Sequence, residues 1–498
     1  MSHFLASAGV LFAAAGAAGA ILLPAGRLRA TAMLVALVLF PALILGDQWH
    51  SHQIADLRDP ASGLIALGLA ALAISAGLAY LFSRWSVLLP LAVIAALPFR
   101  VPLHAGGDTA NLLVPLYLVI AGGVLAFAAE SWRGSASSGV GPPTAPPAGW
   151  AVTWLPRVLA LVAALYAAQT LYSADFSKGL QNLCFFFVPF SLVYGLLRDV
   201  SWDRKLLSLV VWVIGLEAVA FVMVGSVEWV SRDLFWNRQV IRSNEFHTYF
   251  RVNSVFWDPN VYGRYLALVT VVATSVLLWA RERRTLALLT ALAAVLWFGL
   301  FPTYSQSSFV ALLAGLAVLA ALKWSVKWTA IAVGVLAIGG VLVILLAGGA
   351  SKLSPNRINV DLSGRGNLIS GGAHLFAQRP VYGYGSGSFP RAYREHVRTK
   401  KAPVSVSHTE PVTVAAEQGV VGLAAYFALL VTALWTMASG LQRRLSVARI
   451  AVFATFVALL VHTMAYAGFY EDPIAWVLLA LGASLAARVG PCPDTSDA

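Results

Sequence analysis

The chain has 498 residues, of which 59% are hydrophobic and only 11% are charged. Soluble domains carry about 25% charged residues, so this composition excludes a water-soluble fold of this size. The net charge of +12 would suggest nucleic acid as the partner of a soluble protein. Here the cations lie between apolar runs, so we expect membrane lipids and an anionic lipid-linked substrate as partners, and no nucleic acid.

Fifteen segments are apolar and long enough, or nearly so, to cross a membrane, which takes about 20 residues. They begin near residues 4, 30, 61, 86, 110, 158, 180, 206, 261, 285, 309, 329, 412, 450 and 473. Because the windows at 86–99 and 309–322 are short, we predict an all-α polytopic membrane protein with about 14–15 transmembrane helices. We interpret 4–23 as a retained span, since no positive charge precedes it, although 14–20 resembles a signal cleavage site.

The distribution of positive charge orients these helices. With the N-terminus outside, every predicted cytoplasmic turn contains a Lys or Arg, from Arg27 and Arg29 at the first turn to Arg488 at the last. The cysteines, Cys184 and Cys492, provide no disulfide framework.

This topology divides the chain into five parts, one of them a linker rich in Ser, Gly and Pro. We predict N-terminal transmembrane helices (1–133), a flexible cytoplasmic linker (134–149), central transmembrane helices with an outer loop at 226–260 (150–349), an extracytoplasmic catalytic loop (350–410), and C-terminal transmembrane helices with a short tail (411–498).

Two outer segments depart from the positive-inside rule. Of the 34 Lys and Arg, 17 fall outside, and 14 of these lie in 226–264 (five) and 350–410 (nine); eleven of the 14 are Arg. A loop of about 60 residues can escape the rule and be merely soluble. The other interpretation is a basic chamber that receives an anion, because guanidinium groups suit phosphate oxygens.

Two outer segments also have the residues of a helix start. In Trp-Asp-Pro-Asn at 257–260, Asp258 can cap the helix and Pro259 suits its first position. His-Thr-Glu-Pro at 408–411 is expected to do the same for the span near 412. Such helix ends bind phosphate, although capping alone would explain both segments.

The long outer loop has further local structure. Residues 364–378 have the apolar spacing of an amphipathic helix that rests on the membrane interface, Pro380 ends it, and 382–389 is a glycine-rich bend. Of the loop's histidines, only His408 abuts a membrane helix, where its imidazole can accept a proton from a hydroxyl. The alternative is a structural or solvated histidine.

Two acids fall inside predicted spans, where a carboxylate is costly unless it is paired or functional. Glu417 lies about two turns into the span near 412, and Glu217 is expected to pair inside the bundle. The spacing in the first outer loop fits no strong metal-ligand pattern, so we expect no metal and no cofactor. The residues considered there are His50, His52, Asp56 and Asp59.

Together these segments resemble the bacterial O-antigen ligase and O-antigen polymerase superfamily over roughly residues 240–425. The motifs are Arg251 to Asn260 with Gly263; Ser363-Gly-Arg365 with Arg379-Pro380 and Gly383 to Phe389; and Ser407-His408 with Glu417, Gly419 and Gly422. Two positions depart from the family pattern. Ser305-Gln306-Ser307 stands where the family often has Ser-Arg-Gly, and Thr409 stands where Asn usually follows the histidine.

The resemblance implies a GT-C-like, inverting, metal-independent glycosyltransferase of the bacterial inner membrane, with its active site on the extracytoplasmic face. It implies a glycan donor linked to undecaprenyl pyrophosphate and a glycan or lipid-core acceptor, without separating ligase from polymerase. Polysaccharide-export and chain-length-control proteins are candidate partners. The implied site consists of His408 and Glu417 as catalytic residues, Arg251, Arg365, Arg242 and Arg264 as pyrophosphate ligands, and Asp258 and Asn260 as structural residues.

Two other functions remain open from the sequence. A transporter or flippase of lipid-linked oligosaccharides would place polar groups and broken helices near the bilayer midplane, whereas the polar motifs here cluster at the outer interface. A structural scaffold in an envelope-building complex is the second alternative. Transfer by the purified protein from a lipid-linked donor would separate an enzyme from both.

Overall fold

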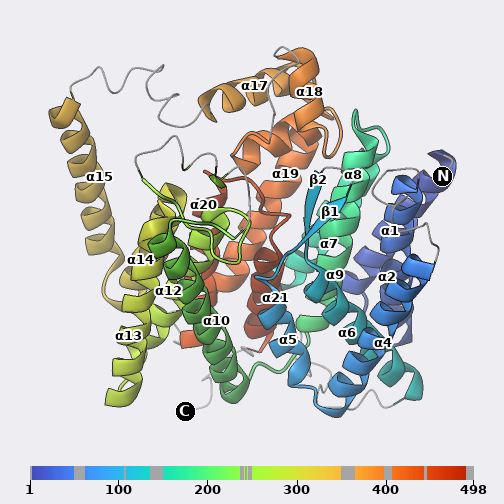
Figure 1. Ribbon diagram of the computed structural model, residues 1–498, viewed down its shortest axis with the longest axis horizontal. Helices are drawn as coiled ribbons and strands as arrows, with labels where there is room; N and C mark the ends of the chain where they lie inside the picture. Colours follow the sequence, from blue (N-terminus) through green and yellow to red (C-terminus); the bar gives the residue numbers. More distant parts are fainter. Residues whose placement is uncertain are drawn as a thin grey trace, which may run out of the picture.

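The computed structural model describes residues 3–49, 62–105, 108–134, 150–235, 240–241, 244, 249–348, 365–397, 406–441 and 446–488. The helices of this part of the chain are α1 (His3–Leu22), α2 (Arg27–Gln48), α4 (Ser62–Arg84), α5 (Leu88–Ala96), α6 (Val114–Arg133), α7 (Trp150–Thr170), α8 (Phe176–Asn182), η1 (Leu183–Phe187), α9 (Val188–Leu197), α10 (Arg204–Ser231), α12 (Pro259–Trp279), α13 (Arg283–Leu300), η2 (Phe301–Thr303), α14 (Gln306–Lys323), α15 (Val326–Gly348), α17 (Arg365–Gln378), α18 (Phe389–His396), α19 (Glu410–Ala438), α20 (Val447–Thr463) and α21 (Pro473–Ala487). Most of them stand side by side in one bundle (Figure 1).

Among the described residues, eleven helices are long and apolar enough to cross a membrane. They occupy eleven of the fifteen predicted windows, and the apolar helices α5, α15, α20 and α21 occupy the other four. The predicted all-α polytopic membrane fold is therefore confirmed. One short hairpin was not expected: β1 (Val101–Ala105) pairs antiparallel with β2 (Asp108–Leu112).

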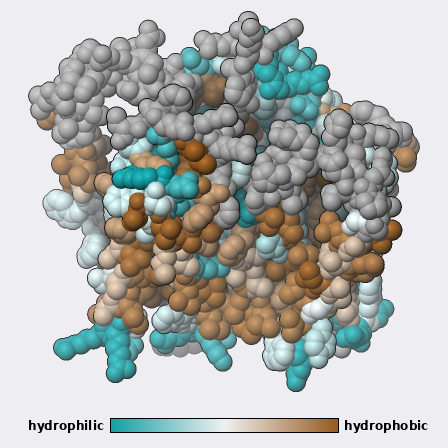
Figure 2. Space-filling model, viewed as in Figure 1, coloured by the Kyte–Doolittle hydropathy of each residue, from teal (hydrophilic) through white to brown (hydrophobic). Residues whose placement is uncertain are grey.

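The outer surface of the bundle agrees with a membrane setting. Hydrophobic residues cover the middle of the face in Figure 2, and hydrophilic residues gather at its lower edge and around α17 and α18 at the top. Large apolar side chains are exposed on the peripheral helices, where a soluble protein would bury them. Examples are Leu72 on α4, Trp212 and Leu216 on α10, Phe298 on α13, Leu336 on α15 and Trp435 on α19.

The centre of the bundle is formed by α9 and α21, which are buried along nearly their whole length. Trp476 of α21 packs edge-on against Phe187 and Phe190. Just before α9 the helix widens into the π-helical turn η1. Pro189 has no N–H to offer the carbonyl of Phe185, one helical turn earlier, and that oxygen instead accepts a hydrogen bond from the Tyr117 hydroxyl at 2.9 Å.

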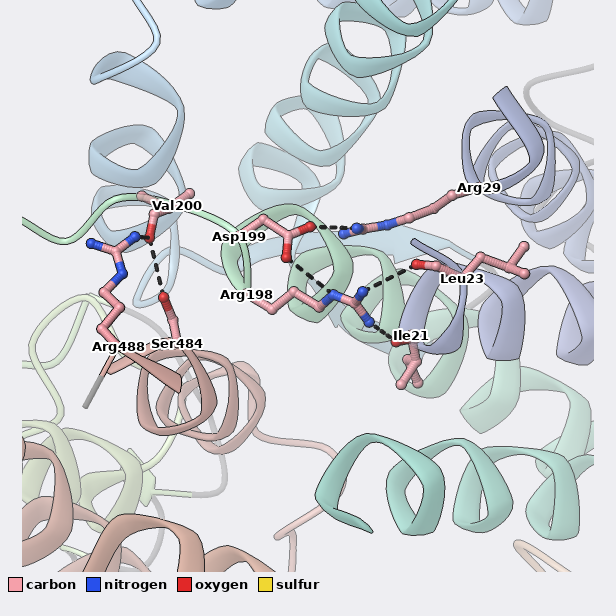
Figure 3. Close-up of polar contacts among 8 residues, drawn as sticks. All are labelled: Ile21, Leu23, Arg29, Arg198, Asp199, Val200, Ser484 and Arg488. Carbon is pink, nitrogen blue, oxygen red and sulfur yellow. Dashed lines mark hydrogen bonds and ion pairs between the residues drawn. The ribbon is translucent and has the colours of Figure 1, made fainter. Parts of the chain in front are cut away.

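Turns that were predicted to be cytoplasmic meet at one end of the bundle, and Figure 3 shows their contacts. The buried guanidinium of Arg29 pairs with Asp199 at 2.5 Å. Arg198 donates to the carbonyl oxygens of Ile21 and Leu23, and Arg488 donates to that of Val200 at 2.8 Å. These bonds connect the turn after α9 with the end of α1, the start of α2 and the end of α21.

Turns that were predicted to be outside meet at the opposite end, under α17, which lies across the top of the bundle in Figure 1. Ala174 donates its amide to Tyr384 at 2.9 Å, and Val252 donates to Pro302 at 3.1 Å. Turns predicted to lie on the same side of the membrane therefore meet at the same end of the bundle. Which end faces the cytoplasm stays a prediction. The predicted linker lies outside the described residues except for Gly134, which ends α6 in a left-handed conformation.

Candidate functional site

The loop that enters α12 is held from below by a buried carboxylate. Glu228, near the end of α10, accepts the backbone amides of Asn253 at 3.1 Å and Ser254 at 2.7 Å. Ser254 has a φ of 52°, a conformation that costs about 1 kcal/mol or more for a residue with a side chain. The carboxylate therefore stabilises a turn that the backbone alone would disfavour.

Arg251 lies at the start of this loop, with its guanidinium plane fixed by two bonds. Its Nε donates to the carbonyl of Thr303 at 2.9 Å, and one terminal nitrogen donates to Oδ1 of Asn260 at 3.1 Å. Asn260 is in the first turn of α12, and the same Oδ1 accepts from the Ser305 hydroxyl at 3.0 Å. Arg251 is half-buried, at the end of the bundle that was predicted to be outside.

Asp258 caps α12 as predicted, because its Oδ1 accepts the amide of Asn260 at 2.6 Å. Its other oxygen accepts a hydrogen bond from the Tyr466 hydroxyl at 3.2 Å. Burial, with the negative charge of Asp258 adding to it, raises the pKa of this phenol far above its ordinary value. Tyr466 therefore keeps its proton and remains a donor to Asp258.

His408 lies immediately before α19, with its ring centroid 6.2 Å from that of Tyr466. Its φ of 64° places a strained bend at this residue. The predicted cap at 408–411 is partly wrong. Thr409 occupies the cap position without a side-chain cap bond, and the Ser407 hydroxyl ties the bend together instead, bonding the carbonyl of Thr409 and the hydroxyl of Thr413, each at 2.8 Å.

These contacts form one continuous path across the same end of the bundle. It runs from Arg251 to Asn260, from there to Asp258, and then through Tyr466 to His408. The hydrogen bonds thus run from the guanidinium predicted to bind pyrophosphate to Tyr466, whose ring contacts the imidazole predicted to accept a proton. In the chain these two residues are 157 positions apart (408 minus 251).

A second branch of the network was missed by the sequence analysis. The Ser305 hydroxyl bonds those of Ser307 at 3.2 Å and Ser308 at 2.7 Å, and Ser307 bonds Nε2 of the buried His462 at 3.2 Å. An ionisable residue inside a membrane helix is a signal of function, and it would have indicated His462. Gln306, where the family often has arginine, has an exposed side chain.

Arg264, the third predicted cation of this region, is buried and paired with Asp472 at 3.1 Å. This ion pair offsets its charge. Nearby Arg100, which the sequence analysis did not select, has no acidic partner among the described residues. Both guanidinium groups line a cavity of about 20 Å³, and both are close enough to Tyr466 to lower its pKa slightly.

Glu417 binds the glycine-rich bend that precedes α18. Its two carboxylate oxygens accept the amides of Gly387 at 2.8 Å and Phe389 at 3.0 Å. The structure thus assigns it to holding this bend, and shows no hydrogen bond or ion pair between it and an arginine or histidine among the described residues. Its predicted catalytic role stays a prediction.

The bend fits into a break in α19. Gly419 has a φ of 64° inside the helix, so carbonyl groups that precede it lose helical partners. They accept instead from the bend: the carbonyl of Ala416 from Tyr384 at 3.2 Å and that of Glu417 from Gly385 at 2.7 Å. A Cβ on Gly419 would lie 2.2 Å from the carbonyl oxygen of Val381. Only glycine permits this approach.

Glu410, in the first turn of α19, holds the loop that carries Tyr466. It accepts the amides of Gly468 at 2.7 Å and Phe469 at 3.1 Å. Buried carboxylates must find such donors, because an unpaired one is strongly disfavoured. The loops that carry Arg251 and Tyr466, and the bend before α18, are thus each held by one buried glutamate.

The remaining predicted residues are only partly placed. Arg365 is the first residue of α17, so the start of the predicted interfacial helix is confirmed, but its side chain is outside the described part. Arg242 and the four metal candidates of the first outer loop also lie outside the described residues. His374 and His396 are exposed on α17 and α18. Glu217 bonds the Tyr265 hydroxyl at 3.0 Å inside the bundle, as expected.

Comparison with known proteins gives one match. Residues 291–427 match the family model described as O-antigen ligase. This segment contains Arg365, His408 and Glu417 but begins after the loop of Arg251 and Asp258. No curated protein matches the chain. The resemblance expected from the sequence is confirmed over the matched segment.

Proposed function

Since residues 291–427 match the family model described as O-antigen ligase, we propose that this chain moves a glycan from undecaprenyl pyrophosphate to an acceptor hydroxyl. Glycan transfer of the O-antigen ligase type is what the family supports in general. The identity of the donor, the outer face as the place of reaction, and an inverting course that needs no metal are parts of our proposal.

The donor's pyrophosphate is assigned to the Arg251 side of the network. A guanidinium group binds phosphate oxygens through paired N–H groups, and Arg251 is held in position by Thr303 and Asn260. The N-terminal end of α12 adds a positive dipole at the same place, while its first backbone amides donate to Asp258. Arg365, at the start of α17, is the second proposed ligand, with Arg242 in the loop before Arg251. Arg264 supports the site through its ion pair with Asp472.

His408 is assigned to the acceptor. Its imidazole takes the proton of the acceptor hydroxyl while that oxygen attacks the anomeric carbon from the face opposite the pyrophosphate. The bond between the anomeric carbon and the phosphate oxygen breaks, the configuration inverts, and undecaprenyl pyrophosphate leaves with the electron pair. Arginines that stabilise this developing charge can take the place of a divalent cation.

One observation carries the proposal: Tyr466 contacts both His408 and Asp258. Through Tyr466, the proposed base His408 is connected to the start of α12. A displacement at the anomeric carbon requires a base for the acceptor and a binding site for the pyrophosphate, and our proposal assigns these roles to the two ends of this connection. Catalytic positions must be fixed to within a fraction of an ångström to be effective. The buried glutamates that hold these loops support such precision.

We expect His408→Ala to insert and fold like the unchanged protein but to lose at least about 100-fold in transfer, since positioned acid–base groups contribute about 10²–10⁴-fold. The measurement is transfer from a purified lipid-linked donor, with the melting temperature in detergent as the check on folding. His374→Ala, an exposed histidine of α17, is the matched control.

Near-normal turnover of the His408→Ala protein would remove the proposed base. Absence of transfer by the unchanged protein with any lipid-linked donor, together with movement of that donor across the bilayer, would replace the enzyme by a transporter.

A further inference from the structure

A cavity of about 70 Å³ has a wall that includes residues on both sides of His408 in the chain and, among the described residues, no arginine. Val406 and Glu410, which flank the His408 bend, both contribute to its wall, as does Gly468 from the loop of Tyr466. The glycine-rich bend closes another side at Gly387. The cavity is therefore formed by the same loops that the buried glutamates hold.

The polar groups of this cavity differ from those around Arg251. Three acidic residues line it, Glu410, Glu417 and Glu471, against one basic residue, the exposed Lys178. Glu410 and Glu417 accept backbone amides, which leaves Glu471 as the acid available to a ligand. Carboxyl oxygens accept hydrogen bonds, and like charges within a few ångströms repel. This wall suits a neutral ligand that offers hydroxyl groups and disfavours a diphosphate.

Two buried polar residues of the cavity wall have side-chain oxygens that form no hydrogen bond with any other described residue than each other. Tyr166 and Asn182 both line the cavity; they are only 4% and 7% exposed, and the oxygens concerned are the Tyr166 hydroxyl and Oδ1 of Asn182. Neither atom hydrogen-bonds to a described residue outside this pair. A buried polar group left unsatisfied costs about 1–3 kcal/mol, so a ligand that hydrogen-bonds here would regain that free energy.

The cavity also has an aromatic side. The ring of Tyr166 stacks on that of Phe187 with centroids 3.9 Å apart, and both rings line the cavity together with Tyr470. Apolar walls that carry a few converging polar groups are typical of small-ligand sites. A sugar ring has this dual character, with C–H faces and hydroxyl edges.

We propose that this cavity is the acceptor subsite, which binds the neutral sugar that carries the attacking hydroxyl and presents that hydroxyl to His408. Glu471 and Asn182 accept hydrogen bonds from the other hydroxyls of this sugar. The inference rests on the proposed function, and it separates the two substrates: the phosphate-bearing donor on the arginine side of Tyr466 and the uncharged acceptor on the carboxylate side.

The test measures binding without requiring transfer. Ala467, which lines the cavity, is changed to cysteine in a Cys492→Ser background, where the remaining Cys184 is buried. The rate of maleimide labelling of the Ala467→Cys protein is measured with a panel of neutral methyl glycosides and, separately, with inorganic pyrophosphate. We expect at least one glycoside to slow labelling and pyrophosphate to have no effect.

Glu471→Gln should raise the glycoside concentration needed for protection by about tenfold, the effect of losing one good hydrogen bond. Glu395→Gln, a matched change on the exposed face of α18, should leave it unchanged. Asn182→Ala gives an independent variant should Glu471→Gln unfold the loop.

Protection by pyrophosphate alone, protection by nothing, or protection that survives both Glu471→Gln and Asn182→Ala would each overturn the acceptor subsite. None of these results depends on turnover, so they are distinguishable from a failure of the proposed function, which transfer assays report.

Discussion

A buried carboxylate that accepts backbone amides recurs at three positions, Glu228, Glu410 and Glu417. Each acid is at least 25 residues away in sequence from the loop whose amides it accepts. Loops cannot satisfy their own amides through regular secondary structure. Water, which could otherwise accept hydrogen bonds from these amides, is scarce in a buried membrane environment. A glutamate from a neighbouring helix supplies two acceptor oxygens at once.

Glu417→Gln tests this role at the residue scale. The glutamine keeps one acceptor oxygen but turns its NH₂ group toward the second amide, leaving a buried donor unsatisfied at a cost of about 1–3 kcal/mol. We expect a lower melting temperature and a loss of transfer that follows the loss of folded protein. Glu395→Gln should change stability by less than about 0.5 kcal/mol. Full stability with transfer abolished would instead favour a direct catalytic role.

Arg251→Lys tests the donor side. Lysine keeps the positive charge but cannot reproduce the planar fork that Thr303 and Asn260 hold. We expect the donor KM to rise about tenfold, equivalent to about 1.4 kcal/mol, and the acceptor KM to change less than about twofold. Arg232→Lys, on an exposed arginine that lies over the Trp229 ring, is the control. An unchanged donor KM would count against the phosphate assignment.

At the scale of an element, the break in α19 connects the membrane bundle to the outer loop. The break at Gly419 frees the carbonyl groups that receive the glycine-rich bend, and Gln169 of α7 donates to the carbonyl of Gln418 at 3.1 Å. Gly419 thus allows α19, the glycine-rich bend and α7 to meet near the start of α18, where Glu417 accepts the amide of Phe389.

We expect Gly419→Ala to destabilise the protein by at least about 2 kcal/mol, because a left-handed φ and a contact of 2.2 Å with Val381 both oppose the added methyl group. Thermal unfolding in detergent measures this. Gly77→Ala, in the helix α4 where nothing lies within 4 Å of the added atom, should be neutral. Equal stability of both variants would show that the break does not depend on glycine.

At the scale of the whole molecule, the turns of the chain divide between two ends. Arg29, Arg198 and Arg488 bond at one end, and the candidate site lies at the other. The positive-inside rule assigns the first end to the cytoplasm. The exposed residues Arg27 and His374 lie at opposite ends and are suited to report the orientation.

We expect a membrane-impermeant maleimide to label His374→Cys in intact inner-membrane vesicles of right-side-out orientation, and to label Arg27→Cys only after the membrane is opened. Both are made in the Cys492→Ser background. The reverse pattern would place the site on the cytoplasmic face and remove an outer-face reaction from the proposal.

Local properties of the sequence determined the membrane fold, the positions of the helices, the cap at Asp258, the helix α17 and the match of residues 291–427 to the O-antigen ligase model. Apolar length, helix-start chemistry and motif order are all read over short stretches of chain. The tertiary structure decided which polar groups meet. Tyr466, Arg100, Glu228 and the loop-holding role of Glu417 could not be selected from the sequence, because their partners lie on other segments of the chain. Hydrogen bonding between such distant residues depends on how the helices pack, and no spacing within one segment encodes it.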